Sequence, residues 1–438
     1  MRSLFTIGLM IVAMGLNARS LQFHVSVSHS WNKQKLYEPV AIKLSEVPGL
    51  DFEVKSATVF MGHHTGRIDK VEVLQTVCQL DDWDGDQRAD ELFFMASFVA
   101  TRSRDYTIEL FDDEAGDDKF GENDTRGRKW VYADMMLEDK KDKHPLITAL
   151  EAPGDSYLYN DLYHHGAAFE NELCGFRVYF DERQNIDIYG KKMRQLELEK
   201  TNFYTTPEQM KLGFGNDVLW AGNSIGCGSF KGWNGEAPTN IAPVKTRGQR
   251  IVAAGPLRTI VEVKDIGWNG LNMRQYYILY AWRRECEVRI EFDRPLGDET
   301  FATGVQKIGK NPAGFMHKEG AGMIWASWGS DYPEMGKKEQ FPPEAVGLAV
   351  YVPKEYIKTT VESDLNYLFV LGAKGKTSLH YYVAFCADKE EKIETLTPYE
   401  RLATLDDPEG YHDGPTWFAA MAGWKENLEH QVSVKIKK

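Results

Sequence analysis

Residues 258–293, RTIVEVKDIGWNGLNMRQYYILYAWRRECEVRIEFD, indicate the fold most clearly. It holds three largely apolar runs, Arg258–Ile266, Met273–Ala281 and Cys286–Asp293. Asn269-Gly270 separates the first two runs, and this dipeptide is a strong hairpin-turn signal. Arg283-Arg284 marks the next reversal of the chain. Three strands joined by short turns, without a helix between them, predict an antiparallel sheet.

Segments of the same kind continue on both sides of this stretch. A polar turn at residues 181–185 separates two alternating runs, Phe176–Phe180 and Ile186–Ile188, which predicts a hairpin. Further strands are expected at Ala345–Val352, Tyr367–Leu371 and His380–Ala387. Short helices are favoured at Pro207–Lys211 and Leu396–Leu405. Residues 145–438 are too many for a small sandwich, so we predict a large antiparallel β-supersandwich with two facing sheets.

The chain before residue 145 divides into three parts. Residues 21–111 show short segments of period-two alternation with turn signals, which predicts a small β-sandwich. Residues 112–144 are dense in charged side chains and predict a linker or exposed loop. Residues 1–20 resemble a signal peptide, with Arg2, a short apolar run and Ala18-Arg19-Ser20. We expect a periplasmic or secreted protein that is soluble after removal of the signal peptide and has no membrane span.

Composition and short motifs argue against several kinds of binding partner and several catalytic mechanisms. The formal net charge of −13 argues against a nucleic-acid partner, although a local basic pocket for an anionic sugar remains compatible with it. The five cysteines lack the paired spacing of a zinc site, and we expect unpaired thiols: Cys78, Cys174, Cys227, Cys286 and Cys386. The chain has no Gly-x-Ser-x-Gly and no His-Glu-x-x-His, so serine-hydrolase and zinc-protease mechanisms are unsupported.

Residues 80–92, LDDWDGDQRADEL, predict a calcium site. Asp82, Asp84, Asp86 and Asp90 place carboxylates at alternate positions of a tight loop, and calcium needs six to eight oxygen ligands. Gly85 falls one position early for an EF-hand, and no helix pattern flanks the loop. The bound ion would therefore stabilise a β-domain rather than take part in catalysis. The alternative is a solvated acidic turn between two strands.

The segment YHHGAAFENE, residues 163–172, carries the first set of candidate site residues. Tyr163, His164 and His165 can supply a general base and a general acid, and Glu170 and Glu172 can bind substrate. If the segment is a strand, the two histidines face opposite sides, so only one enters a given cleft. The alternative is one packing histidine and one exposed histidine.

Two further segments add candidates. In the glycine-rich run Gly213–Gly235, the rings of Trp220 and Trp233 can stack on sugars. Asn216, Asp217 and Asn223 can bond hydroxyl groups. The alternative for this run is a loop packed by its own aromatic rings. In residues 410–418, His412 beside an aspartate is a further candidate acid or base. Candidate carboxylate clamps are Arg247, Arg250 and Arg274, although surface ion pairs explain each of them as well.

Several of these motifs together resemble a known family. DWDGDQRADELFF, YHHGAAFENE with the following FRVYFDERQNIDIYGKK, and GPLRTIVEV look like the exported bacterial family catalogued as domain of unknown function 4861. The strand series Gly255–Asp293 also resembles the β-supersandwich of galactose mutarotases and polysaccharide lyases. The resemblance implies polysaccharide degradation, and specifically an ulvan oligosaccharide dehydratase that leaves a 4,5-unsaturated sugar.

We therefore expect a carbohydrate-active lyase or dehydratase, a carbon–oxygen lyase acting on a uronic-acid oligosaccharide of ulvan or pectin type. This chemistry needs a cation or donors at the carboxylate, a base for the proton at C5 and an acid for the oxygen leaving C4. One alternative is a glycoside hydrolase that uses paired carboxylates, Glu170 or Glu172 with Asp217. The other is a non-catalytic sugar-binding or mutarotase-like protein.

Overall fold

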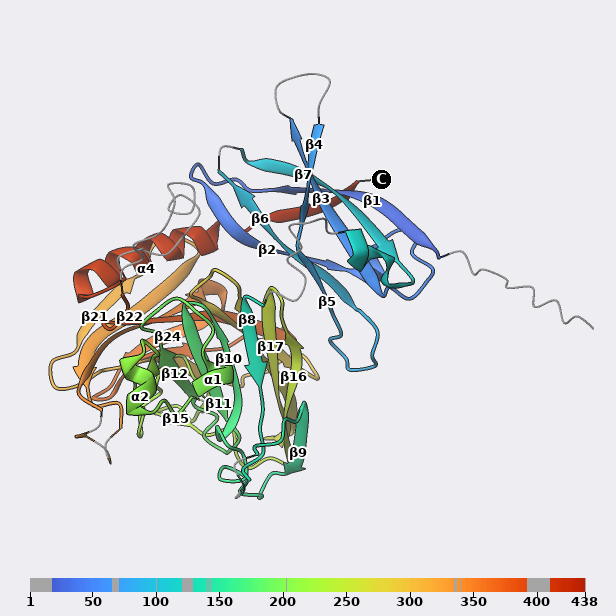
Figure 1. The fold of residues 1–438 in the computed structure, drawn as a ribbon. Coiled ribbons are helices and arrows are strands. Elements are labelled where there is room, and N and C mark those ends of the chain that lie inside the picture. Colours follow the sequence, from blue (N-terminus) through green and yellow to red (C-terminus); the bar gives the residue numbers. More distant parts are fainter. Residues whose placement is uncertain are drawn as a thin grey trace, which may run out of the picture.

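The computed structural model of the protein describes residues 18–64, 71–99, 101–119, 129–139, 141, 143–201, 203–334, 336, 338–339, 341–391 and 410–437. Its sheets are antiparallel and form a small sandwich and a large one, so the predicted all-β fold class is confirmed (Figure 1). Most of the predicted signal peptide, and the helix predicted at Leu396–Leu405, lie outside the described residues. Within those residues, no helix is long and apolar enough to cross a membrane.

The small sandwich packs a five-stranded sheet against a three-stranded one. The first sheet has the order β27-β1-β7-β3-β4, with bounds Ser433–Lys437, Ser20–Ser28, Ser103–Phe111, Ser56–His64 and Val71–Thr76. The second has the order β2-β6-β5, with bounds Lys35–Lys43, Glu91–Phe98 and Cys78–Asp81. Phe23, Val25 and Val27 of β1 are buried, as the period-two alternation predicts. A 3₁₀ helix, η1 (Leu44–Glu46), follows β2.

The domain boundaries differ from the prediction at two places. Strand β27 pairs with β1 in the small sandwich, so residues 433–437 do not belong to the large domain as we expected (Figure 1). The segment 112–144 is not only a linker, because it contains η2 (Glu114–Lys119) and strand β8 (Val131–Asp134). Strand β8 pairs with β10 (Gly166–Asn171) of the large sandwich.

The large sandwich has a nine-stranded sheet on one side and two five-stranded sheets on the other. The nine-stranded sheet comprises β21 (Ala313–His317), β22 (Gly322–Asp331), β23 (Glu344–Pro353), β26 (Ser378–Ala387), β19 (Cys286–Phe292), β18 (Leu271–Tyr280), β17 (Arg258–Trp268), β16 (Thr246–Ala254) and β9 (Ala149–Pro153). Side chains from all three sheets, such as Phe176, Tyr277 and Phe369, share one core.

The two five-stranded sheets face this large sheet across the core. One, called here the β8–β13 sheet, has the order β13 (Asn216–Asp217), β12 (Ile186–Gly190), β11 (Cys174–Tyr179), β10 and β8. The other has the order β15 (Pro238–Thr239), β14 (Lys231–Trp233), β20 (Phe301–Gln306), β25 (Asn366–Leu371) and β24 (Ile357–Glu362). A short helix, η3 (Lys354–Tyr356), precedes β24.

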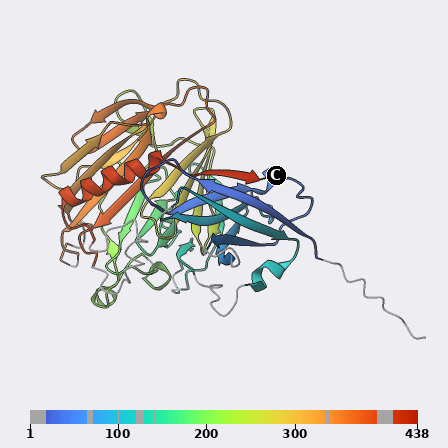
Figure 2. The ribbon, with the colours of Figure 1, turned by 90° about the horizontal axis from the view of Figure 1, so that it is seen from above.

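Helix α4 (Gly414–Glu429) and the small sandwich together cover the outer face of the nine-stranded sheet (Figure 2). Trp417 and Met421 of α4 pack on one part of this face, and Phe93 of β6 packs with Ile260 and Ile278 on another. Two short helices, α1 (Leu198–Thr201) and α2 (Pro207–Lys211), lie by the β8–β13 sheet (Figure 1). The helix predicted at residues 207–211 is thus confirmed, whereas α4 was not predicted.

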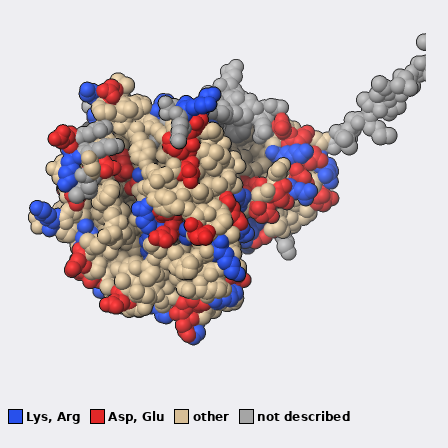
Figure 3. Space-filling model, turned by 90° about the horizontal axis from the view of Figure 1, so that it is seen from below, with Lys and Arg blue, Asp and Glu red and all other residues tan. Residues whose placement is uncertain are grey.

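Surface charge and thiol state agree with the composition. On the face seen from below, Lys and Arg side chains are interspersed with Asp and Glu (Figure 3). None of the five cysteines forms a disulfide, as we predicted.

Candidate active site

The candidate site lies on the outer face of the β8–β13 sheet. The residues of β11 and β12 that enter the core are Phe176, Val178, Ile186 and Ile188. Because successive side chains of a strand point to opposite faces, Arg177, Tyr179 and Asp187 point away from that core. The register of the β11–β12 hairpin places Arg177 directly opposite Asp187. The local sequence of this hairpin is therefore enough to place the Arg177–Asp187 pair on the outer face of the sheet.

Arg177 is the centre of this site. Its Nε and Nη2 donate to Asp187 Oδ2 at 2.8 and 2.5 Å, and its Nη2 lies 3.3 Å from Asp217 Oδ2. Its Nη1 donates to the Tyr204 hydroxyl at 2.7 Å, and the guanidinium lies 4.2 Å from the Phe203 ring centroid. Burial is the largest single influence on Arg177 and opposes its charge. Asp187 and smaller contributions from Tyr179, Tyr204 and Asp217 together outweigh burial and raise the pKa of the guanidinium well above its usual value. Burial and the Asp187 charge raise the pKa of Asp217 well above its usual value.

Four tyrosines surround His165 and Arg177; we call Tyr159, Tyr163, Tyr179 and Tyr204 the tyrosine cluster. The His165 ring stacks on Tyr159 at 3.7 Å and lies 6.1 Å from both Tyr179 and Tyr204. Tyr163 meets Tyr204 edge-on at 6.1 Å. Tyr204 is 40% exposed and the other three are half-buried. The cluster therefore presents aromatic faces and hydroxyl groups to solvent above a fixed positive charge.

His165 is held in the chemical state that a general base requires. Its Nδ1 lies 2.8 Å from the Tyr159 carbonyl oxygen, which can only accept, so Nδ1 carries the proton and Nε2 keeps its lone pair. Burial lowers the pKa of His165, which keeps the ring neutral near pH 7. The backbone turns here at a φ of 60° for His165, before Gly166, where a Cβ would overlap the Val178 carbonyl oxygen.

His164 lies beneath this surface and not on it. Its side chain is fully buried, and neither ring nitrogen has a hydrogen-bond partner among the described residues. Nε2 is 3.7 Å from Asp134 Oδ1, and Tyr132 donates to Asp134 Oδ2 at 2.9 Å. Burial lowers the pKa of His164 to about 3 and raises that of Asp134 to about 7. The two histidines occupy the turn before β10 rather than a strand, and only His165 is accessible to a substrate.

Arg183 provides a second cation beside the tyrosine cluster. It lies in the turn between β11 and β12, with its guanidinium carbon 4.8 Å from the Tyr159 ring centroid and 5.2 Å from that of Tyr179. It pairs with Asp181, and its side chain remains 40% exposed. Unlike Arg177, this guanidinium can reach a ligand from solvent.

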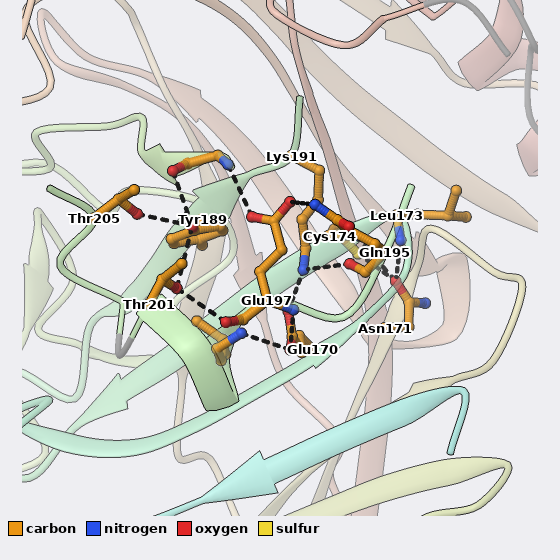
Figure 4. Close-up of polar contacts among 12 residues, drawn as sticks. Glu170, Asn171, Leu173, Cys174, Tyr189, Lys191, Gln195, Glu197, Thr201 and Thr205 are labelled. Carbon is orange, nitrogen blue, oxygen red and sulfur yellow. Dashed lines mark hydrogen bonds and ion pairs between the residues drawn. The ribbon is translucent and has the colours of Figure 1, made fainter. Parts of the chain in front are cut away.

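Glu170 and Glu172, predicted to bind substrate, are not placed to do so. Glu170 is fully buried, pairs with Lys191, and accepts from the backbone N–H groups of Glu197 and Leu198 at 2.7 Å (Figure 4). These contacts fix the loop before α1 to β10. Glu172 follows β10, whereas His165 precedes it, so roughly 20 Å of strand separates them. Strand register places Glu170 opposite Gly175, Gly175 opposite Tyr189 and Tyr189 opposite Asp217, so roughly 14 Å separates Glu170 from Asp217, and Glu172 lies farther along the chain. Paired glycosidase carboxylates lie about 5–9.5 Å apart, so the expected pair of Glu170 or Glu172 with Asp217 is wrong.

The three arginines predicted as carboxylate clamps lie on the nine-stranded sheet instead. Arg247 is buried and donates to Asp265 at 3.1 Å. Arg250 donates to Glu262 at 3.0 Å. Arg274 is exposed, and it lines a cleft between this sheet and the small sandwich. Arg247 and Arg250 therefore form ion pairs within the protein, which was the alternative explanation for them.

The remaining predicted residues divide between the site and its surroundings. Asp217 reaches Arg177, as described above, and Trp220 follows it with 49% of its surface exposed. Asn216 is buried and bonds Lys389. Trp233 is half-buried on β14, in the neighbouring five-stranded sheet.

His412 lies just before α4, where its Nδ1 is 2.9 Å from Asp388 Oδ1. Asp388 immediately follows β26 and precedes Lys389, which bonds Asn216. The structure thus brings Tyr163, His165 and Asp217 together. His412 instead lies beside Asp388, at the end of β26. The predicted convergence of all three histidines with the glycine-rich run is met only in part.

With this geometry in place, comparison with known proteins identifies the family. The sequence profile described as domain of unknown function DUF4861 matches residues 27–403. The chain belongs to the DUF4861 family. Among curated proteins, the DUF4861 chain has no match.

Two solved structures from Enterococcus faecalis each cover 95% of the DUF4861 chain. One is a protein in glycosyl hydrolase family 38, with 9% identity and a TM-score of 0.40, and the other is an alpha-mannosidase, with 8% and 0.37. A 4-alpha-glucanotransferase from Thermococcus litoralis covers 60% of the chain, with 10% identity and a TM-score of 0.26. The chain spans 47%, 46% and 40% of these structures, in that order.

Sequence reasoning missed several site residues of this DUF4861 chain, namely Tyr159, Arg177, Tyr179, Arg183, Asp187 and Tyr204. The signal for two of them was present. In Phe176–Phe180 and Ile186–Ile188, the apolar positions alternate with Arg177 and Asp187, which places both charges on the face opposite the core. Tyr159 and Tyr204 come from loops, and their positions depend on the folded chain.

The acidic loop of the DUF4861 chain lies apart from this site, between β5 and β6. Carboxylate oxygens of Asp82, Asp84 and Asp86 all lie within 4.8 Å of one another. Asp90 instead accepts from the Trp83 backbone N–H at 2.7 Å and closes the loop. The first three carboxylates have the oxygen chemistry that calcium prefers. A structural calcium ion at this loop stays a prediction.

Proposed function

We propose that the protein is a carbohydrate-active enzyme that eliminates water or a sugar from a uronic-acid oligosaccharide and leaves a 4,5-unsaturated product. The observation that carries this proposal is His165. A neutral imidazole, with Nδ1 bonded to the Tyr159 carbonyl and Nε2 available, stands among accessible tyrosines beside two arginines. This is the set of groups that proton abstraction next to a carboxylate requires.

The tyrosine cluster and Arg183 suit an acidic sugar. Aromatic rings bind the apolar C–H faces of sugars by packing, and their hydroxyl groups add hydrogen bonds. The half-exposed guanidinium of Arg183 can form a charge-assisted bond to the sugar carboxylate. Such a bond neutralises the carboxylate and makes the proton at C5 more acidic. Arg177 remains committed to Asp187, so its role is to fix the site and its positive field.

The elimination then needs one base and one acid. His165 Nε2 takes the C5 proton, and the C5 electron pair forms the C4=C5 bond as the C4–O bond breaks. The leaving oxygen takes its proton from Tyr204, whose hydroxyl accepts from Arg177 and so keeps its own proton free to donate. Burial raises the pKa of Tyr204 to about 12, so the phenol is protonated at neutral pH. The proton on His165 then restores Tyr204 through solvent.

Glycoside hydrolysis is the second candidate, because Asp187 and Asp217 both contact Nη2 of Arg177. The raised pKa of Asp217 suits a general acid. Asp187, however, is buried and already accepts from Arg177 and from the Tyr179 hydroxyl at 2.9 Å. Such a carboxylate is poorly placed to attack a sugar, so we favour elimination.

The test uses saturated oligosaccharides from ulvan and pectin, with ultraviolet absorbance as the readout, since only elimination makes a conjugated C=C bond. The His165→Ala variant should lose about a hundredfold or more of the turnover, with its melting temperature nearly unchanged. His24→Ala is the matched control, because His24 is an exposed histidine of β1 in the small sandwich. Full activity of His165→Ala would show that this site is not the catalytic one. Affinity without any product would favour a binding protein.

A further inference from the structure

A cleft opens beside Arg183. It has a volume of about 480 Å³, within the range of about 300–1,000 Å³ that is typical of ligand sites. Arg183 and Asn185 contribute to its wall from the β11–β12 turn, and Asn223 contributes from the loop after β13. Arg183 also contacts the Tyr159 ring, so one side chain borders both the tyrosine cluster and this cleft.

The loop that follows Asp217 is a second connection between the candidate active site and the cleft, besides Arg183. Asp217 contacts Arg177, Trp220 is 49% exposed, and Asn223 lines the cleft. Gln306 fixes this loop, because it donates to the Trp220 carbonyl at 3.2 Å and accepts from Ser224 Oγ at 2.7 Å. An exposed indole therefore stands on the segment that runs from the candidate active site to the cleft.

Lys231 brings a buried donor to the cleft. It is 6% exposed, and its Nζ donates to the Arg183 carbonyl and, at 2.8 Å, to Asn185 Oδ1. In its ammonium form Lys231 has three donors, so one remains beyond the two bonds described, and this form is favoured below about pH 7. Burial lowers the pKa of Lys231 to about 7, which agrees with a group that lacks full charge compensation.

The other polar groups of the cleft suit a sugar. They are mostly amides and hydroxyls, from Asn185, Asn223, Thr239, Asn240, Ser363 and Asn366. The charged side chains include both signs, since Glu182 and Glu236 accompany Arg183 and Lys231. Uncharged donors and acceptors in this number match a ligand rich in hydroxyl groups better than a phosphate or a hydrophobic ligand.

We infer that this cleft is a second saccharide subsite, which binds the sugar next to the one that reacts at the tyrosine cluster. The inference rests on the proposed function for its choice of ligand. With this subsite, the enzyme would act on oligosaccharides that extend past Arg183. Trp220 would then lie beside the bound saccharide chain. An oligosaccharide long enough to fill both places should then bind more tightly than a shorter one.

The experiment compares a disaccharide with a tetrasaccharide, both from ulvan and from pectin, by calorimetry on the His165→Ala protein. Asn223→Trp fills the cleft from an exposed loop position, so it should spare the fold. It should weaken tetrasaccharide binding by at least about tenfold and leave disaccharide binding nearly unchanged, because a tenfold change corresponds to the loss of one or two good hydrogen bonds. Asn32→Ala, at an exposed position of the small sandwich, is the control and should change neither.

Equal tetrasaccharide affinity in Asn223→Trp and its parent would overturn the subsite, as would the absence of any oligosaccharide binding. Lys231→Met provides a second variant, checked for folding by its melting curve, and should also lower tetrasaccharide affinity. Failure of the proposed function looks different. The protein with His165 intact would then form no unsaturated product, while binding of the tetrasaccharide would still depend on Asn223 and Lys231.

Discussion

At the scale of single residues, His164 and Asp134 show how burial sets the charge of a pair. Both side chains are nearly inaccessible to water, and their polar atoms lie 3.7 Å apart. The folded protein holds His164 neutral, with a pKa of about 3, and holds Asp134 as a carboxylic acid up to about pH 7. The pair lies next to Tyr163, so its protonation state affects the floor of the candidate active site.

The two groups influence stability in opposite directions. Asp134 has a higher pKa in the folded state than its usual 3.8, so its contribution to stability is full below that value and is lost as the pH rises toward 7. His164 has a lower pKa in the folded state than its usual 6.5, so its contribution is full above that value and is lost as the pH falls toward 3. Between about pH 4 and 6.5 the two effects partly cancel.

Asp134→Asn should therefore stabilise the protein at alkaline pH. Asparagine keeps an oxygen for Tyr132 but carries no charge, so the variant avoids a buried carboxylate above pH 7. We expect a melting temperature at pH 8 that is at least about 2 °C higher than that of the parent, and a smaller difference at pH 5. Asp364→Asn, at an exposed position, should show no such pH dependence. Equal gains at both pH values would contradict this account.

Local sequence patterns predicted some residues of the candidate site. They did not predict the long-range contacts that complete it. Tyr163, His165 and Asp217 were found because unusual polar side chains interrupt strand patterns. Arg177 was within reach of the same reasoning, since the hairpin alternation sets it opposite Asp187. The contact of Arg177 with Tyr204 joins residues 27 positions apart through an irregular loop, and no local pattern encodes that approach.

At the scale of elements, strands joined by tight turns were the predictable part. The runs around Asn269-Gly270 became β17 and β18, with Arg258 opposite Tyr280, because alternation and turn chemistry act over few residues. Helix α4 was overlooked even though it has start signals, since Asp413 accepts from the Thr416 N–H and Pro415 lies in its first turn. Its sequence mixes glycine and aromatic residues, which obscures the helical periodicity.

The loop between β5 and β6 is the element on which the calcium prediction rests. The residues that flank it, Asp81 and Glu91, each lie 2.5 Å from Nη2 of Arg258, and Arg250 donates to the Trp83 carbonyl at 2.6 Å. The loop is thus attached to the nine-stranded sheet at both ends. An ion that orders it would stabilise the interface between the two sandwiches as well as the small one.

Excess chelator should consequently lower the melting temperature by about 3 °C, because an ion present at a hundredfold its Kd contributes about 2.7 kcal/mol to a chain of this size. Asp84→Ala should show the lower value without chelator and no further response to it. Asp364→Ala should respond as the parent does, since Asp364 lies outside the acidic loop. An identical melting curve with and without chelator would rule out a bound structural calcium.

At the scale of the whole molecule, the first and last strands of the described residues pair with each other. Strand β27 pairs with β1 over five residues, with Ser433 opposite Ser28 and Lys437 opposite His24. This pairing joins residues 405 positions apart, so sequence patterns cannot reveal it, and the predicted domain boundary missed it. Because α4 directly precedes β27 and packs on the nine-stranded sheet, the C-terminal segment links the large sandwich to the small one (Figure 2).

Removal of residues 432–438 should therefore weaken the small sandwich more than the large one. Without β27, the backbone of β1 becomes an open sheet edge, which loses hydrogen bonds and exposes a surface for aggregation. We expect faster hydrogen exchange in residues 24–28, measured by mass spectrometry, and little change in β17 or β18. Lys435→Ala is the matched control, since it alters an exposed side chain of β27 and keeps the backbone pairing. Unchanged exchange in β1 after truncation would mean that the strand adds no stability to the sheet. Faster exchange throughout both sandwiches would instead show that they unfold as one cooperative unit, joined through Arg258 and the acidic loop.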